Sequence, residues 1–194
     1  MKAAWLTSDA DLERFSDSFG ARTSNPLDPA YLAETRVRGF WQDGDLVGGY
    51  IVNAAAPWRY MDMVPEARHT DPRVRKYLFG GKSAEIACMW LDRRRVTPRM
   101  RYLIYMTNVR DQLRTGRKYI VAGSLARGVA QIHRNGFRRM VYAGEIDWSG
   151  APQGEIYATS RWELAWHSIH IFGSGLGDLW HNKTKRRANL GRSR

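Results

Sequence analysis

The residues of this 194-residue chain that could do chemistry gather around a short apolar run and the turn after it. Glu85 is the one acid in the run from Ala84 to Leu91, which has the apolar character of a central strand. Burial disfavours the charged form of a carboxyl group, so Glu85 would have a raised pKa and suit the role of a proton acceptor. The alternative is an ordinary glutamate that points outward at the start of its strand.

Arginines crowd the turn that follows this run, at Arg93, Arg94, Arg95, Arg99 and Arg101. Among them Thr97-Pro98 predicts a helix start, with Thr as the cap and Pro in the first turn. A helix N-terminus and guanidinium groups both attract phosphate oxygens. The segment therefore predicts a diphosphate site, and the alternative is a solvated basic rim.

Thiol and metal chemistry are less favoured. Cys88 is the only cysteine, which excludes a disulfide framework and a Cys-based zinc site. A lone cysteine in an apolar strand is usually inert core, so we do not assign it a nucleophilic role. His167 and His170 would point to opposite faces of a predicted strand, and we predict no metal site.

The first half of the chain predicts elements that frame the Glu85 run. Ser8 starts a helix that ends near Gly20, and Asp43-Gly44 is the tip of a hairpin over 40–52. Residues 53–83 are irregular, with a short helix after Asp71-Pro72.

In the second half, strands alternate with helices. A helix runs from Thr97 to Gly116, and the remaining elements are a strand Tyr119–Ala122, a helix over 125–135, a strand over 139–146, and one or two strands over 155–170. This order predicts a mixed sheet covered by helices. Near its end, Trp162, Trp166 and Phe172 would seal the core or line a substrate channel.

The charge is strongly positive. Thirty-one Lys and Arg face 19 Asp and Glu, a net charge of +12, which predicts an anionic partner. Residues 181–194 hold six bases and no acid. We expect one domain over 1–180 and a basic tail over 181–194, which is either a solvated end or an anion-binding arm.

Acids at Asp9, Asp11 and Glu13 interrupt any signal-peptide pattern, and no stretch is apolar enough to span a bilayer. We therefore expect a soluble cytoplasmic protein.

Three local matches make the chain similar to the GNAT N-acyltransferase superfamily over about residues 1–172. They are the strand Ala84–Leu91 followed directly by a helix, the strand Tyr119–Ser124 followed by a short helix, and the triplet Asn135-Gly136-Phe137. The resemblance implies an α/β fold, with a central mixed sheet of about six or seven strands flanked by helices. It also implies acyl-CoA or acetyl-CoA as co-substrate, without a metal.

The sequence departs from the family at the pyrophosphate loop. Family members carry glycines there, but residues 93–101 contain none. Glycine lets backbone amides approach phosphate closely, so the arginines and the helix start would have to hold the phosphates here.

The resemblance also implies roles for single residues. Glu85 corresponds to a general-base glutamate of histone-acetylating members, and the backbone of Met89, Trp90 and Leu91 would pair with the pantetheine arm. Arg93, Arg94, Arg95, Thr97 and Arg99 would hold phosphates, and Ser124 would bind CoA or cap a helix.

The general acid is less defined. The family often has a tyrosine where this chain has Ile132, so His133 or Tyr142 would substitute, with Tyr119 as a further choice. The alternative for each of these residues is a structural role without catalytic function, as a histidine on a helix surface or as a core or surface tyrosine.

The leading hypothesis is an N-acyltransferase that moves an acyl group directly from acyl-CoA or acyl carrier protein to an amine. Its hallmark would be two adjacent parallel strands, near Glu85 and Ser124, that separate to form a cleft, with residues 53–83 as a lid or substrate loop. The alternative is a nucleic-acid-binding protein, or an acyltransferase that acts on nucleic acid or aminoacyl-tRNA. A peripheral membrane role would be electrostatic only, and the sequence leaves a homodimer open.

Overall fold

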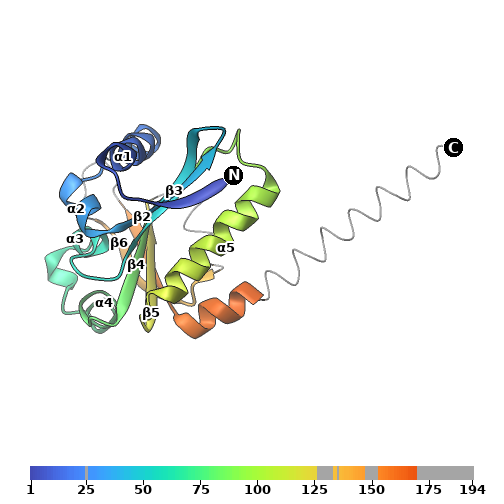
Figure 1. The fold of residues 1–194 in the computed structure, drawn as a ribbon. Helices are drawn as coiled ribbons and strands as arrows, with labels where there is room; N and C mark the ends of the chain where they lie inside the picture. Colours follow the sequence, from blue (N-terminus) through green and yellow to red (C-terminus); the bar gives the residue numbers. More distant parts are fainter. Residues whose placement is uncertain (25, 126–132, 135, 147–152, 170–194) are drawn as a thin grey trace.

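One mixed sheet organises the molecule (Figure 1). The computed structural model describes residues 1–24, 26–125, 133–134, 136–146 and 153–169. Within them the strands lie in the order β1-β2-β3-β4-β5-β7-β6. Their bounds are β1 Lys2–Leu6, β2 Arg36–Gln42, β3 Asp45–Asn53, β4 Ser83–Leu91, β5 Tyr119–Ser124, β6 Arg139–Gly144 and β7 Gly154–Ser160. Among the described strands only β4 and β5 pair in parallel, so the predicted mixed sheet is confirmed.

Helices cover both faces of this sheet (Figure 1). One face carries the N-terminal helical elements: α1 Asp9–Thr23, α2 Pro29–Glu34, α3 Arg59–Met63, the 3-10 turn η1 Glu66–Arg68, α4 Pro72–Val74 and the π-helical turn η2 Arg75–Phe79. The opposite face carries α5 Pro98–Arg114 and a helix over 161–169.

Local signals in the sequence explain where these elements start. The Ser8 side chain accepts a hydrogen bond from the backbone N–H of Asp11 at 3.2 Å, which caps α1 as predicted. Thr97 caps α5 in the same way at Met100, 3.3 Å away. Asp43 and Gly44 both have positive φ, as a two-residue hairpin turn requires.

Two hydrophobic cores lie on the two faces of the sheet. The first packs α1 to α4 against β4, β5 and β7, with Phe15, Tyr60 and Val121 among its members. The second packs α5 and the 161–169 helix against the other face, through Ile104 and Leu164.

A buried ion pair fixes α5 to the sheet. Asp111 accepts hydrogen bonds from Arg38 of β2 and from the Tyr50 hydroxyl of β3, each at 2.8 Å. The side chains of Arg38 and Asp111 are 7% and 1% exposed. Both charges are therefore shielded from water and depend on each other.

Two predictions fail near the chain ends. The strand β1 was not expected, and the expectation of strands over 155–170 is wrong beyond Ser160, where a helix begins. Ser160 and Glu163 form a reciprocal capping box, in which each backbone N–H donates to the other side chain. His167 therefore lies on a helix, and His170 and Phe172 fall outside the described residues.

Trp162 and Trp166 also differ from expectation. They do not seal the core, because their side chains are 77% and 61% exposed. The predicted helix over 125–135 lies almost wholly outside the described residues. None of the helices in the described part of the chain has the length and hydropathy that crossing a bilayer requires.

Candidate active site

The two parallel strands separate after a short paired stretch. β4 and β5 pair from Ser83 with Tyr119 to Ile86 with Ala122. Beyond Ile86, β4 continues to Leu91 with β3 as its only recorded partner among the described strands. The two strands therefore stop pairing near Glu85 and Ser124, as the predicted separation requires.

A bulge bends β4 where it leaves β5. Ala87 pairs with Ile51 and Trp90 with Gly49, so Cys88 and Met89 together face Tyr50. Cys88 adopts a φ of 54°, and the side chain of Met89 is 47% exposed. Such bulges redirect side chains and leave backbone groups outside the regular ladder.

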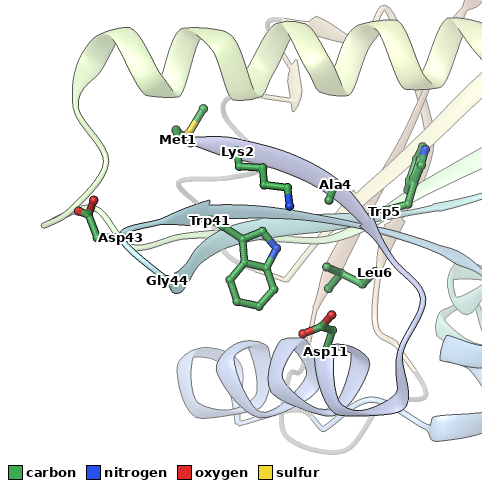
Figure 2. Close-up of a pocket in the computed structure, with 9 residues that line it drawn as sticks. All are labelled: Met1, Lys2, Ala4, Trp5, Leu6, Asp11, Trp41, Asp43 and Gly44. Atoms are coloured by element: carbon green, nitrogen blue, oxygen red, sulfur yellow. The ribbon is translucent and has the colours of Figure 1, made fainter.

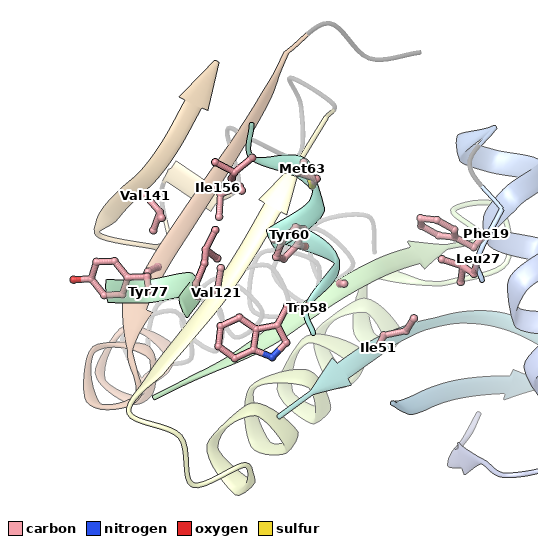
Figure 3. Packing of buried hydrophobic residues seen from close by; sticks show 14 of the residues in the cluster. Phe19, Leu27, Ile51, Trp58, Tyr60, Met63, Tyr77, Val121, Val141 and Ile156 are labelled. Atoms are coloured by element: carbon pink, nitrogen blue, oxygen red, sulfur yellow. The ribbon is translucent and has the colours of Figure 1, made fainter. Parts of the chain in front are cut away.

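Tyr60 fills the point where the strands separate (Figure 3). Its hydroxyl lies 2.8 Å from the carbonyl oxygen of Ile86 on β4 and 3.4 Å from that of Gly123 on β5. A Cβ atom at Gly123 would lie 2.7 Å from the Tyr60 ring, so only glycine accommodates this close approach. Tyr60 thus acts as a wedge that is bonded to both strands.

Glu85 contacts the backbone of Tyr60, the residue that forms this wedge. It is 1% exposed, which excludes an outward-facing glutamate. The Tyr31 hydroxyl donates to one of its oxygens at 2.7 Å, and the backbone N–H of Tyr60 donates to the other at 2.9 Å. Burial nevertheless outweighs these bonds and raises the pKa of Glu85 to about 7.

Cys88 is unsuited to nucleophilic attack. Burial raises the pKa of its thiol to about 12, and the nearby Arg59 guanidinium, 3.5 Å from the sulfur, only partly opposes this. The thiol is therefore protonated at neutral pH, whereas a nucleophilic cysteine requires the thiolate.

The arginine-rich turn joins β4 to α5. The Asp92 side chain accepts from the backbone N–H of Arg94 at 3.0 Å. Arg95 forms an ion pair with Asp45 of the β2–β3 hairpin at 2.8 Å, so it ties the turn to the sheet. Thr97 caps α5, and Arg93, Arg94 and Arg99 are exposed around that helix start.

The other two predicted catalytic residues are not brought to Glu85. Tyr142 lies on β6, three strands from β4 and thus about 14 Å away at ordinary strand spacing. Its hydroxyl donates to the Glu145 carbonyl. His133 packs against Tyr157, which lies on the opposite face of the sheet from Val121, the partner of Glu85. Burial lowers the pKa of His133 to about 4, so it carries no proton to donate as an imidazolium at neutral pH.

Sequence reasoning missed Tyr31 and Tyr60. They stand 54 and 25 residues from Glu85, and nothing local marks either tyrosine as its partner. For Tyr60 the one usable signal was the clustering of aromatic residues in the irregular segment 53–83, and Tyr31 had no such signal.

A pocket of about 650 Å³ lies elsewhere, between β1, the β2–β3 turn and α1 (Figure 2). Trp5, Trp41 and Asp11 are among its lining residues. It is on the far side of β3 from the opening between β4 and β5, so it adds nothing to that site.

Replacing Tyr60 with phenylalanine is expected to destabilise the fold by about 1–3 kcal/mol, because two buried carbonyl oxygens lose their hydroxyl partner. Urea unfolding measures the change. Tyr119→Phe, also on the sheet and packed on Tyr77, is the control and is expected within about 0.5 kcal/mol of the parent. Equal stability of both variants would contradict the wedge role.

Comparison with known proteins finds similarity in the fold but not in the sequence. No family model matches the chain, and no curated protein is similar to it in sequence. In contrast, FeeM, an N-acyl amino acid synthase from uncultured soil microbes, superposes with a TM-score of 0.62 at 13% identity, over 87% of this chain and 94% of that one.

Two acetyltransferases are similar at lower scores. The ribosomal-protein-S18-alanine N-acetyltransferase from Escherichia coli gives a TM-score of 0.53 at 12% identity, over 82% of this chain and 92% of that chain. A GNAT family acetyltransferase from Elizabethkingia anophelis with acetyl-CoA bound gives 0.50 at 10% identity, over 82% and 97%. At these identities the likeness concerns the fold alone.

Proposed function

We propose that this chain, whose fold is that of the GNAT acyltransferases, moves an acyl group from acyl-CoA or acyl carrier protein to an amine. The single observation that carries the proposal is the opening between β4 and β5, with Glu85 at its narrow end and the arginine-rich turn beyond β4. Transfer is direct, because the Cys88 thiol is protonated and no acyl-enzyme is needed.

The donor lies along β4. The backbone of Met89, Trp90 and Leu91 has no β5 partner and pairs with the amides of a pantetheine arm as an added strand would. Arg93, Arg94 and Arg99 supply guanidinium groups for phosphates at the start of α5. Arg95 and Thr97 shape this turn through the Asp45 ion pair and the helix cap.

Glu85 accepts the amine proton through Tyr31. The amine nitrogen attacks the thioester carbonyl and passes its proton to the Tyr31 oxygen, while the Tyr31 proton moves to Glu85. Glu85 itself is covered by Tyr31 and by the start of α3, so Tyr31, which is half-buried, is the group an amine reaches first. The thiolate leaves when the tetrahedral intermediate collapses and takes a proton from water, since an ordinary thiol has a pKa near 8.5.

Titration with acyl-CoA of increasing chain length, followed by calorimetry and by thermal shift, tests the proposal. We expect saturable binding, with free CoA and pantetheine as controls that separate the phosphate contacts from the arm. The proposal fails if neither acyl-CoA nor acyl carrier protein binds up to millimolar concentration.

The double substitution of Arg93 and Arg94 by alanine is expected to raise KM for acyl-CoA by about 100-fold or more, since each of the two charged hydrogen bonds to phosphate contributes about 1.5–3 kcal/mol. The value of kcat should change little, because these groups do not touch the reacting atoms. Arg114→Ala, at the other end of α5, is the matched control. An unchanged KM would show that these arginines do not bind the phosphates and only form a solvated rim.

A further inference from the structure

The starts of β4 and β5 and the end of β7 lie side by side at one end of the sheet, at the bottom of Figure 1. Ser83 on β4 pairs with Tyr119 on β5, and Tyr119 pairs with Ser160 on β7. The nine residues of β4 span about 26 Å from here to Leu91. This end of the sheet is therefore remote from the arginine-rich turn.

A basic residue adjoins each of these three strand ends. The backbone N–H of Lys118 donates to the carbonyl oxygen of Lys82 at 2.9 Å, and the backbone N–H of Arg161 donates to the carbonyl oxygen of Lys118 at 3.0 Å. These bonds extend the alignment of the strands by one residue. The three bases thus form a row whose backbones stand about 4.8 Å apart, the ordinary strand spacing.

Two further bases flank this row. The Lys76 ammonium lies 5.8 Å from the centre of the Tyr119 ring, and the Lys118 ammonium lies 5.4 Å from it. The Arg117 guanidinium donates to the carbonyl oxygen of Gly81 at 3.2 Å. These contacts restrict the positions of the charges before any partner arrives. We call the following set the basic end of the sheet: Lys76, Lys82, Arg117, Lys118 and Arg161.

No acid balances the basic end of the sheet. Within the described residues, none of its five side chains forms an ion pair. The stretches 72–84 and 112–144, which supply four of the five bases, contain no Asp or Glu. Glu163, on the adjoining helix, already pairs with Arg139. The three lysines are exposed, and like charges held this close repel one another unless an anion binds between them.

We propose that the basic end of the sheet binds the phosphate backbone of a single-stranded nucleic acid. Such a strand carries one negative charge per nucleotide, and these repeated charges match a row of bases. The contacts are made to phosphates and not to base edges, so binding is independent of the nucleotide sequence. The site shares no residue with the acyl-transfer site and is independent of that proposal.

The make-up and position of the basic end favour nucleic acid over other anionic partners. Lysine is depleted in the core of protein–protein interfaces, whereas three of these five residues are lysines. An acyl carrier protein that delivers its arm along β4 would lie against the arginine-rich turn, at the opposite end of that strand. A bilayer attracts bases anywhere on a face and does not require them in a row.

Fluorescence anisotropy of a labelled oligouridylate, titrated with the full chain over a range of salt concentrations, tests the proposal. The test variant combines Lys76→Gln, Lys82→Gln and Lys118→Gln. Each phosphate contact to a single strand adds about 0.7 to the salt slope, so the loss of three should lower its magnitude by about 2. At about 0.1 M salt this change corresponds to roughly 100-fold weaker binding. Arginine at the same three positions should keep parental binding, because phosphate contact requires the charge.

The matched control removes three exposed charges from the opposite end of the sheet, through Lys2→Gln, Arg14→Gln and Arg101→Gln. It should bind within about 3-fold of the parent, since exposed charges this distant are screened by salt. The proposal is overturned if the oligouridylate is not bound at low salt, or if the lysine variant loses no more affinity than the control. It is also overturned if the lysine variant loses binding to phosphatidylserine vesicles but not to the oligouridylate, which would make the partner a membrane.

Discussion

Replacing Glu85 with glutamine is expected to lower kcat/KM for acyl transfer by about 100-fold or more, the usual contribution of a positioned proton acceptor. Glutamine keeps the shape of the side chain and can still accept from the Tyr60 N–H, but it cannot take a proton from Tyr31. The measurement is steady-state kinetics with the acyl donor and amine that the binding titration identifies.

The pH profile separates this chemical role from a structural one. Only ionised Glu85 accepts a proton, so parental kcat/KM should rise with pH through about 7 and then level off. Glu85→Gln should lose this rising limb. Tyr31→Phe should lower kcat while KM for the acyl donor stays unchanged. A Glu85→Gln enzyme that keeps both its rate and its rising limb would refute the assignment.

The same substitution should affect stability in the opposite direction. The pKa of Glu85 rises from 4.5 to about 7 on folding, so the folded state holds this proton more tightly than the unfolded state does. The stability that protonated Glu85 contributes to the fold is fully present below pH 4.5. It is lost as the pH rises through 7, and the loss is roughly 3 kcal/mol. At pH 8 we therefore expect Glu85→Gln to unfold at higher urea concentration than the parent.

The second large effect is expected at the buried ion pair. Asp111→Ala should destabilise the fold by about 3–5 kcal/mol, because it leaves the Arg38 guanidinium buried without its carboxylate. It also removes the acceptor of the Tyr50 hydroxyl. A loss of this size is a large share of the stability of a typical domain and is measurable by urea and thermal unfolding.

A second ion pair in the chain provides the control. Asp45 and Arg95 approach to the same 2.8 Å, but their side chains are 66% and 36% exposed. Asp45→Ala should therefore cost no more than about 1 kcal/mol. If the two alanine variants lose similar amounts, shielding from water is not what makes the Arg38–Asp111 pair important.

Local signals made most of the fold predictable. Capping residues marked α1 and α5, Asp43-Gly44 marked the hairpin, and apolar runs marked β4 and β5. The helix over 161–169 had such a signal in the Ser160–Glu163 capping box, which the apolar content of the segment obscured. By contrast, β1 is defined by its pairing with β2 across more than 30 residues of chain, and such pairing leaves no local mark.

The site was less predictable for the same reason. The run around Glu85 indicated a buried carboxyl group, and the structure bears out the burial. Its environment depends on Tyr31, Arg59 and Tyr60. Arg59 and Tyr60 come from the segment 53–83, which the sequence predicts only as irregular, and Tyr31 comes from a stretch before the hairpin for which it predicts no element. Tertiary packing decides which side chains meet there, and distance along the chain gives no indication of it.

The contact between Tyr60 and Gly123 has a consequence for how this fold can vary. A side chain at 123 would occupy space that the Tyr60 ring already fills, so the two positions share one fixed volume. Homologous chains with a larger residue at 123 should carry a smaller one at 60, and they would lose the hydroxyl between the strands as well. The pair should therefore covary as a single unit, and a designer who wishes to reshape the cleft must change both residues together.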